Sequence, residues 1–323
     1  MKPSLLRRAL VSAMAGGLAS CQRNQPASFA GTSPVAVLRA KNYQQDLTAT
    51  ILEGIRLCGL VVKDKRVLLK PNLVEFDAST AINTDVGLVA AALEAFRSLG
   101  AASVVIAEGP GHRRDTLGLA DEAGYWKGIR DFEGHFVDLN RDDVSPVKNF
   151  LTESQFFLPN TALGADLIVS MPKMKTHHWA GATLAMKNFF GLVPGAVYGW
   201  PKNTLHYLGI ENSIVALNRQ FRRTFAIVDG IVGMEGNGPI QGTAKDVGLL
   251  VFGQDLVAVD STCCRIMGID PAKVGYLQQA MDLGAVDSQQ IHQRGENPIV
   301  VRNDFALIPE FASFRLNPGE KRG

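Results

Sequence analysis

Short apolar, mostly β-branched runs alternate with amphipathic helical patterns along most of the chain, and this alternation limits the folds that it can adopt. The runs that predict strands span residues 35–38, 67–69, 104–106, 167–169, 226–228 and 248–252. Strands that are apolar on both faces and alternate with helices form mostly parallel sheets. We therefore expect an α/β fold with helices on both faces of the sheet, built as a single large domain or as two closely packed α/β lobes.

Helix signals separate these runs. The apolar spacing predicts helices at residues 47–58, 86–99, 181–189, 211–221 and 257–267. Thr84-Asp85 predicts the N-cap of the helix at residues 86–99, and Gly100 predicts its end. Asp260 is either the N-cap of the last helix or a site residue. The glycines of residues 230–239 predict tight turns against a ligand rather than a dinucleotide fingerprint.

The N-terminal segment has the pattern of an export signal. Basic residues precede an uncharged stretch over residues 9–20, which is shorter than the ~20 residues needed to span a bilayer. Leu18-Ala19-Ser20-Cys21 resembles a bacterial lipobox, so we expect Cys21 to be lipidated; the alternative is an ordinary signal cut after Ala30. Arg7-Arg8 loosely resembles a twin-arginine signal.

These signals predict three segments: a lipoprotein-type signal peptide (1–20), a flexible tether (21–33) and an α/β body (34–323). The predicted location is the bacterial cell envelope. There the lipid anchor would hold the protein on the periplasmic side, and Gln22 favours the outer membrane.

Charge and motif content exclude several functions. The chain has 33 basic and 31 acidic residues, three of the basic ones in residues 1–20, so the body is close to neutral and nucleic-acid binding is not expected. No Cys-x-x-Cys, Gly-Lys-Ser/Thr or Gly-x-Ser-x-Gly motif occurs. We therefore expect no iron–sulfur cluster, P-loop or nucleophile elbow in this chain, and interpret Cys58, Cys263 and Cys264 as core thiols.

Ionisable residues follow four of the predicted strands. Parallel neighbours would bring these residues to one rim, where such sheets bind ligands. We predict that the following residues carry the chemistry: Lys70, Glu108, Lys175, His177 and Asp229. We predict that a second set binds the substrate: Asn72, Lys173, Lys187, Asn188, Glu235 and Asn237.

The side-chain types of this rim leave its chemistry open. The lysines suit a carboxylate or phosphate, and one with a depressed pKa could act as a base or a Schiff-base amine; solvated strand ends are the alternative. His177, His178 and His206 could bind a divalent metal, with Asp229 and Glu235 completing the site, or be structural.

Several segments in order resemble the bacterial and archaeal family called domain of unknown function 362. They are Lys70-Pro71-Asn72, Glu108-Gly109, Lys173-Met174-Lys175-Thr176-His177, Ala185-Met186-Lys187-Asn188-Phe189-Phe190-Gly191, Asp229-Gly230, Gly233-Met234-Glu235-Gly236-Asn237-Gly238-Pro239 and Ala258-Val259-Asp260. Some members carry an appended ferredoxin-like domain with cysteine clusters, and others look exported. This chain has no such clusters, so a redox partner would be a separate protein. The resemblance implies no particular reaction.

Two functions fit these observations. The first is an enzyme that acts on a small anionic substrate by proton transfer or group transfer, because acids and bases are mixed at one rim. The second is a non-catalytic periplasmic protein that binds an anion, a metal or a cofactor. Structural scaffolding would leave the ionisable rim unexplained.

Overall fold

The computed structural model describes residues 31–317, and most of its strands join one large sheet. The sheet contains β1 (Ser33–Arg39), β2 (Arg66–Pro71), β3 (Ser103–Glu108), β4 (Phe136–Asp138), β7 (Leu167–Met171), β8 (Lys173–His177), β9 (Gly181–Thr183), β10 (Thr224–Glu235), β11 (Thr243–Gly253) and β12 (Ile291–Gly295). A separate hairpin consists of β5 (Val144–Val147) and β6 (Phe156–Pro159). The predicted signal peptide, Cys21 and most of the predicted tether lie outside the described residues.

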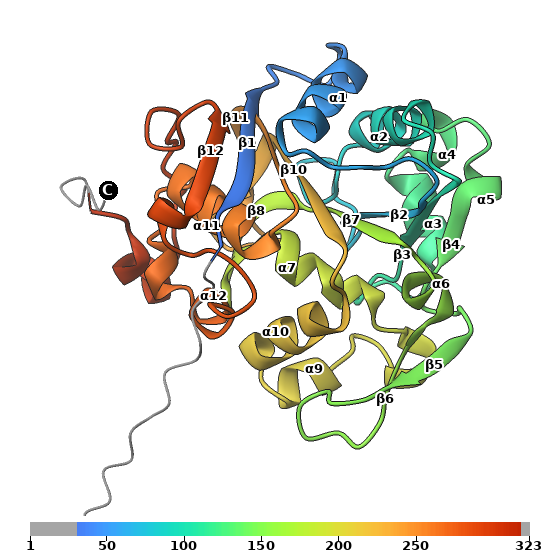
Figure 1. Cartoon of the computed structure of the whole chain (residues 1–323). Helices are drawn as coiled ribbons and strands as arrows, with labels where there is room; N and C mark the ends of the chain where they lie inside the picture. The colour runs from blue at the N-terminus through green and yellow to red at the C-terminus, as the bar shows by residue number, and fades with distance from the viewer. Residues whose placement is uncertain (1–30, 318–323) are drawn as a thin grey trace, which may run out of the picture.

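The sheet is mostly parallel, as predicted. Its order is β12-β1-β11-β10-β7-β2-β3-β4, and β8 pairs with β10 and β9 (Figure 1). The central strands β10, β7, β2, β3 and β4 are parallel neighbours. Strand β11 is antiparallel to both β1 and β10, and β9 is antiparallel to β8. The carboxyl ends of the central strands therefore lie at the same edge.

Helices connect and cover these strands. They are α1 (Leu47–Leu57), α2 (Val86–Ser98), α3 (Thr116–Glu122), α4 (Tyr125–Gly128), α5 (Phe132–His135), α6 (Asn160–Leu163), α7 (Ala185–Asn188), α8 (Gly195–Tyr198), α9 (Thr204–Tyr207), α10 (Ile210–Gln220), α11 (Leu256–Ile266) and α12 (Gly275–Gln279). Short 3₁₀ turns are η1 (Phe189–Leu192), η2 (Pro271–Lys273), η3 (Ser288–Gln290) and η4 (Pro309–Phe314). Within the described part of the chain, no helix has the length and apolarity needed to cross a bilayer.

Both faces of the sheet are buried, which confirms the α/β prediction. Leu68 of β2 faces the core that contains α10 and α11, whereas its neighbours Val67 and Leu69 face the core that contains α1 and α2. Figure 1 shows α1 and α2 on one side of the sheet and α10 on the other. Successive side chains of a strand point to opposite faces, so a doubly covered strand must be apolar at every position.

Several predicted elements are confirmed and two are corrected. The six predicted strands lie within β1, β2, β3, β7, β10 and β11, and Asp85 caps α2 by accepting a hydrogen bond from Gly87 N. The helix predicted over residues 181–189 is instead β9, α7 and η1, because Gly181 has a left-handed φ of 75° and the next residues pair with β8. Of the glycine turns predicted over residues 230–239, residues 230–235 are instead the second half of β10, which continues to Glu235 past a bulge, whereas residues 236–239 form bends and a turn as predicted.

Candidate functional site

A cavity of about 370 Å³ lies beyond the carboxyl ends of β2 and β3. The segments that follow β2, β3 and β9 contribute to its wall, together with β8 itself and the loop after β10. Its polar lining includes most of the predicted site residues: Lys70, Asn72, Glu108, Lys175, His177, His178, Lys187, Asn188, His206 and Asn237. Most of the predicted site residues therefore meet at one cavity.

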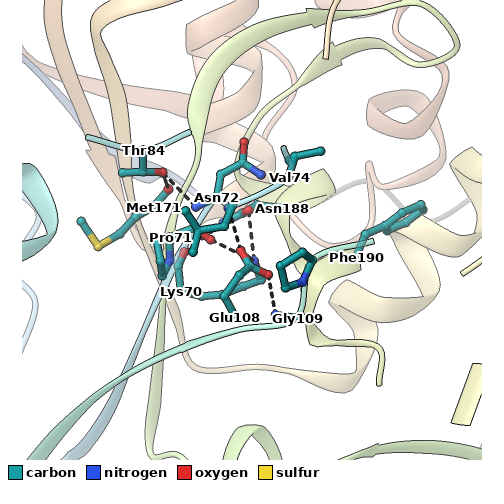
Figure 2. A network of polar contacts seen from close by, with 12 residues as sticks. Lys70, Pro71, Asn72, Val74, Thr84, Glu108, Gly109, Met171, Asn188 and Phe190 are labelled. Carbon is teal, nitrogen blue, oxygen red and sulfur yellow. Dashed lines mark hydrogen bonds and ion pairs between the residues drawn. The ribbon is translucent and has the colours of Figure 1, made fainter. Parts of the chain in front are cut away.

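A buried ion pair between Lys70 and Glu108 is part of the cavity lining, and Figure 2 shows the polar contacts around it. Lys70 Nζ lies 2.6 Å from Glu108 Oε2 and also donates to Asn188 Oδ1 at 3.2 Å. The backbone N–H groups of Leu73 and Gly109 donate to the same carboxylate. Both side chains of the pair are 1% exposed. Burial lowers the pKa of Lys70, and Glu108 opposes that effect.

Gly191 allows the chain to pass directly over this pair. A Cβ atom at position 191 would overlap both Glu108 Oε1 and Lys70 Nζ. Only a residue without a side chain fits there, and this accounts physically for the glycine that ends the Lys-Asn-Phe-Phe-Gly segment.

Three further lysines face the cavity, and among the described residues none of them has a carboxylate partner. Lys175 Nζ donates to the carbonyl oxygens of Ile82 at 2.9 Å and Pro239 at 3.3 Å. Lys202 Nζ donates to the carbonyl oxygens of Gly109 and Phe190. Lys187 Nζ lies 3.6 Å from the centre of the Phe190 ring.

Burial and the repulsion between neighbouring lysines disfavour the protonated, charged forms of these side chains. Burial and the nearby Lys173 and Lys187 ammonium groups hold the pKa of Lys175 well below its usual value. Burial and Lys70 lower the pKa of Lys187 to about 7, and burial is also the main cause of the pKa of about 7 at Lys202. An anion in the cavity would relieve this repulsion and favour the protonated forms.

The two neighbouring histidines differ in which ring nitrogen carries the proton. His177 Nδ1 accepts hydrogen bonds from Trp179 N at 2.9 Å and Ala180 N at 3.2 Å, so the neutral ring carries its proton on Nε2. Burial and Lys187 hold the pKa of His177 well below its usual value. His178 Nδ1 lies 2.8 Å from Gly238 O and therefore donates to it, which leaves Nε2 as an acceptor.

The predicted three-histidine metal site is not formed. Among residues 31–317 no three His, Cys, Asp or Glu side chains are placed to hold a metal ion. Trp179 packs edge-on against both His178 and His206, with ring centroids 4.8 and 5.2 Å away. In addition, a neutral His177 could bind a metal through Nε2 only if its proton moved to Nδ1. Nδ1 cannot carry that proton while it accepts its two backbone hydrogen bonds.

Asp229, predicted to be catalytic, and Lys173, predicted to bind substrate, lie outside the cavity lining and form a separate network. Lys173 Nζ lies 2.7 Å from Asp229 Oδ2, and Tyr43 OH donates to Asp229 Oδ1 at 2.9 Å. Asp85 N also donates to this carboxylate. The predicted binding residue Glu235 is likewise outside the lining and pairs with Lys245 at 2.9 Å. Each of these three residues is paired with an opposite charge, and the structure does not bring them into the cavity with the other predicted site residues.

Asp260 is neither an N-cap of its own helix nor part of the cavity lining. Asp255 caps α11, and Asp260 lies buried within that helix. Its carboxylate accepts hydrogen bonds from Ala185 N at 2.7 Å and Met186 N at 3.2 Å. It therefore anchors the first turn of α7, the helix that carries Lys187.

The cavity also contains polar groups that no sequence pattern singled out. Lys202, Trp179 and Thr183 line it, together with His112 from the glycine loop after β3. Lys202 lies in an irregular segment with a φ of 66°, and no strand end or periodic pattern marks it. Some lining atoms are buried without a hydrogen-bond partner in the described structure, namely Asn72 Oδ1, Thr183 Oγ1 and His206 Nδ1. Such atoms are available to a ligand or to water.

The fold and the site together define an α/β protein with a ligand-sized cavity of lysines and histidines at the carboxyl ends of its strands. The chain belongs to the family described as "Domain of unknown function (DUF362)", whose profile matches residues 67–265. This confirms the resemblance that its motifs indicated.

Among the proteins that are similar to the chain, one is a curated relative and another is a solved structure. The thylakoid-associated protein sll1697 of Synechocystis sp. PCC 6803 is 29% identical over 269 residues, which cover 77% of this chain and 79% of that protein. The lactate racemase apoprotein from Thermoanaerobacterium thermosaccharolyticum aligns with 68% of this chain at 13% identity and a TM-score of 0.42. The alignment spans about half, 54%, of that structure's length, and a likeness this distant carries no functional argument.

Proposed function

We propose that the protein is an enzyme that binds a small organic anion, a carboxylate or a phosphate, in the cavity beyond β2 and β3. The observation that carries this proposal is the set of three lysines, Lys175, Lys187 and Lys202, that face one cavity and lack a carboxylate partner among the described residues. Buried cations without a counter-charge are costly, and an anionic ligand supplies that charge.

The remaining lining favours a ligand with an apolar body. Trp179, Phe190, Leu73 and Ile240 contribute apolar surface between the polar groups. A volume of about 370 Å³ falls in the range of small-molecule sites. We infer an anion attached to a compact organic skeleton rather than a bare inorganic ion.

The histidine pair supports proton transfer as the type of reaction. The rings of His177 and His178 are stacked with centroids 4.9 Å apart. His177 offers an Nε2–H donor, and His178 offers an Nε2 acceptor. A donor and an acceptor at one cavity can act as general acid and general base. A binding protein without turnover is the second candidate, and it would use the lysines without needing this pair.

A thermal-shift screen with small carboxylates and phosphates tests the proposal. We expect stabilisation by a carboxylate that is larger at pH 6 than at pH 9. Lys187 and Lys202 have pKa values of about 7, so above pH 7 they must take up protons before they can pair with the anion. The titratable groups around them are Lys70, Glu108, Asp138, Lys175, His177 and His206.

The affinity for that carboxylate should fall by up to about tenfold per pH unit above pH 7 for each proton taken up. Titration calorimetry in buffers of different ionisation enthalpy should show the uptake directly. No stabilisation by any anion in a broad panel would contradict the proposal, and so would an affinity that rises from pH 7 to pH 9.

We also propose that the protein is an exported lipoprotein, on the basis of the lipobox-like segment that ends at Cys21. Cells grown with radiolabelled palmitate are expected to label the wild-type protein but not Cys21→Ala. An unlabelled wild-type protein in the membrane-free fraction would contradict this location.

A further inference from the structure

Lys187 differs from every other lysine at the cavity. Lys70, Lys175 and Lys202 each donate to two or more oxygen atoms. Lys187 Nζ has no hydrogen-bond acceptor anywhere in residues 31–317 and instead lies over the Phe190 ring. An amine that no acceptor holds is free to react with a ligand.

The backbone that carries Lys187 is fixed on both sides. Ala185 N and Met186 N donate to the buried carboxylate of Asp260. On the other side, Asn188 Nδ2 donates to Lys70 O at 3.0 Å. The four-residue helix α7 thus holds the start of the Lys187 side chain in place, so that only its flexible end can move in the cavity.

The surroundings of Lys187 favour its uncharged form. Burial and Lys70 lower the pKa of its amine to about 7, although the face of the Phe190 ring favours the ammonium. Lys175, Lys202, His177 and His206 line the same cavity, and the carboxylate in that lining, Glu108, is paired with Lys70. In a large fraction of the molecules, the Lys187 side chain is therefore an uncharged, nucleophilic amine at neutral pH.

We propose that Lys187 forms a Schiff base with the carbonyl group of a small 2-oxo carboxylate, whose carboxylate is bound by Lys175 and Lys202. The inference rests on the proposed function, because it takes the anion site as the group that positions the substrate. Beyond the proposed function, it specifies a 2-oxo carboxylate as the substrate class and Lys187 as the nucleophile.

The bond changes balance without an added oxidant or reductant. The Nζ lone pair attacks the carbonyl carbon, and the nitrogen becomes positively charged while the carbonyl oxygen becomes an alkoxide. One proton then passes from the nitrogen to that oxygen, with the acceptor Nε2 of His178 as a relay. Loss of the oxygen as water, with the second nitrogen-bound proton, gives the C=N bond, so one water leaves for each imine formed.

Reductive trapping tests this step. The protein is incubated with pyruvate and sodium cyanoborohydride at pH 7.5, and digested peptides are mapped by mass spectrometry. We expect one dominant reduced adduct, on Lys187. Acetone, which has the carbonyl but no carboxylate, should label Lys187 at least about tenfold more slowly, since it lacks the charge-assisted contacts.

Lys187→Arg is the matched variant because it keeps a cation but has no nucleophilic amine. It should lose the adduct and keep carboxylate-dependent thermal stabilisation, whereas Lys148→Gln, at an exposed position, should label like the wild type. Anion stabilisation without an adduct above the Lys187→Arg level would overturn this inference alone, as would an adduct mainly on Lys175 or Lys202. An adduct on Lys187 without any saturable anion binding would contradict the proposed function instead.

Discussion

Glu108→Gln is expected to lower the free energy of unfolding by about 3–5 kcal/mol, the range found when one partner of a buried ion pair is removed. The substitution keeps the size of the side chain but leaves the Lys70 ammonium buried without its counter-charge. The measurement is equilibrium urea unfolding followed by tryptophan fluorescence at pH 7.

Gly191→Ala should also destabilise the protein strongly, because the added methyl group would push against the Lys70–Glu108 pair.

An exposed ion pair provides the control for the Glu108→Gln prediction. Arg66 and Asp166 form a pair at 2.9 Å on the surface, with side-chain exposures of 61% and 30%. Asp166→Asn should change stability far less than Glu108→Gln, since solvent screens exposed pairs. Equal losses in the two variants would show that the Lys70–Glu108 pair is not the buried pair described above.

The second large effect is expected on ligand affinity. Lys175→Gln and Lys202→Gln should each weaken the binding of an anion found by the thermal-shift screen by about ten- to hundredfold, the equivalent of one charge-assisted hydrogen bond. Each variant removes a cation that faces the cavity while leaving a side chain of similar length. Isothermal titration calorimetry on the folded variants gives the dissociation constants directly.

Lys148→Gln serves as the matched control, because this exposed lysine lies outside the cavity lining and its loss should leave the affinity unchanged. Thermal melts of the free variants separate loss of binding from loss of folding. If both cavity variants bound the anion as tightly as the wild type, the ligand would have to lie elsewhere.

Strand ends predicted the position of site residues where a strand stops at the sheet edge. Lys70 and Glu108 lie in the last residues of two parallel neighbours, so the order of the strands brings both to the same edge of the sheet. The prediction failed at Asp229 because β10 does not end there but continues to Glu235. The local apolar pattern stops at Val228, whereas the backbone pairing that extends the strand depends on β11, which is distant in sequence.

Other parts of the site could not be predicted because tertiary contacts place them. Lys202 lies in a segment without periodicity, and it reaches the cavity through contacts with Gly109 O and Phe190 O. Residues 181–189 have a helical pattern, but the first three of them form β9 because they pair with β8. The role of Asp260 depends on a contact with α7 from 75 residues away, which no local pattern encodes.

A crystal structure of the protein with the tightest-binding carboxylate from the screen would show directly where the anion binds. We expect the ligand to occupy the cavity beyond β2 and β3, with its carboxylate within hydrogen-bond distance of Nζ of Lys175 or Lys202 and its apolar body against Trp179 or Phe190. A ligand bound at the surface or in another cavity, with the Lys175 and Lys202 amines still bonded only to backbone carbonyls, would contradict this expectation.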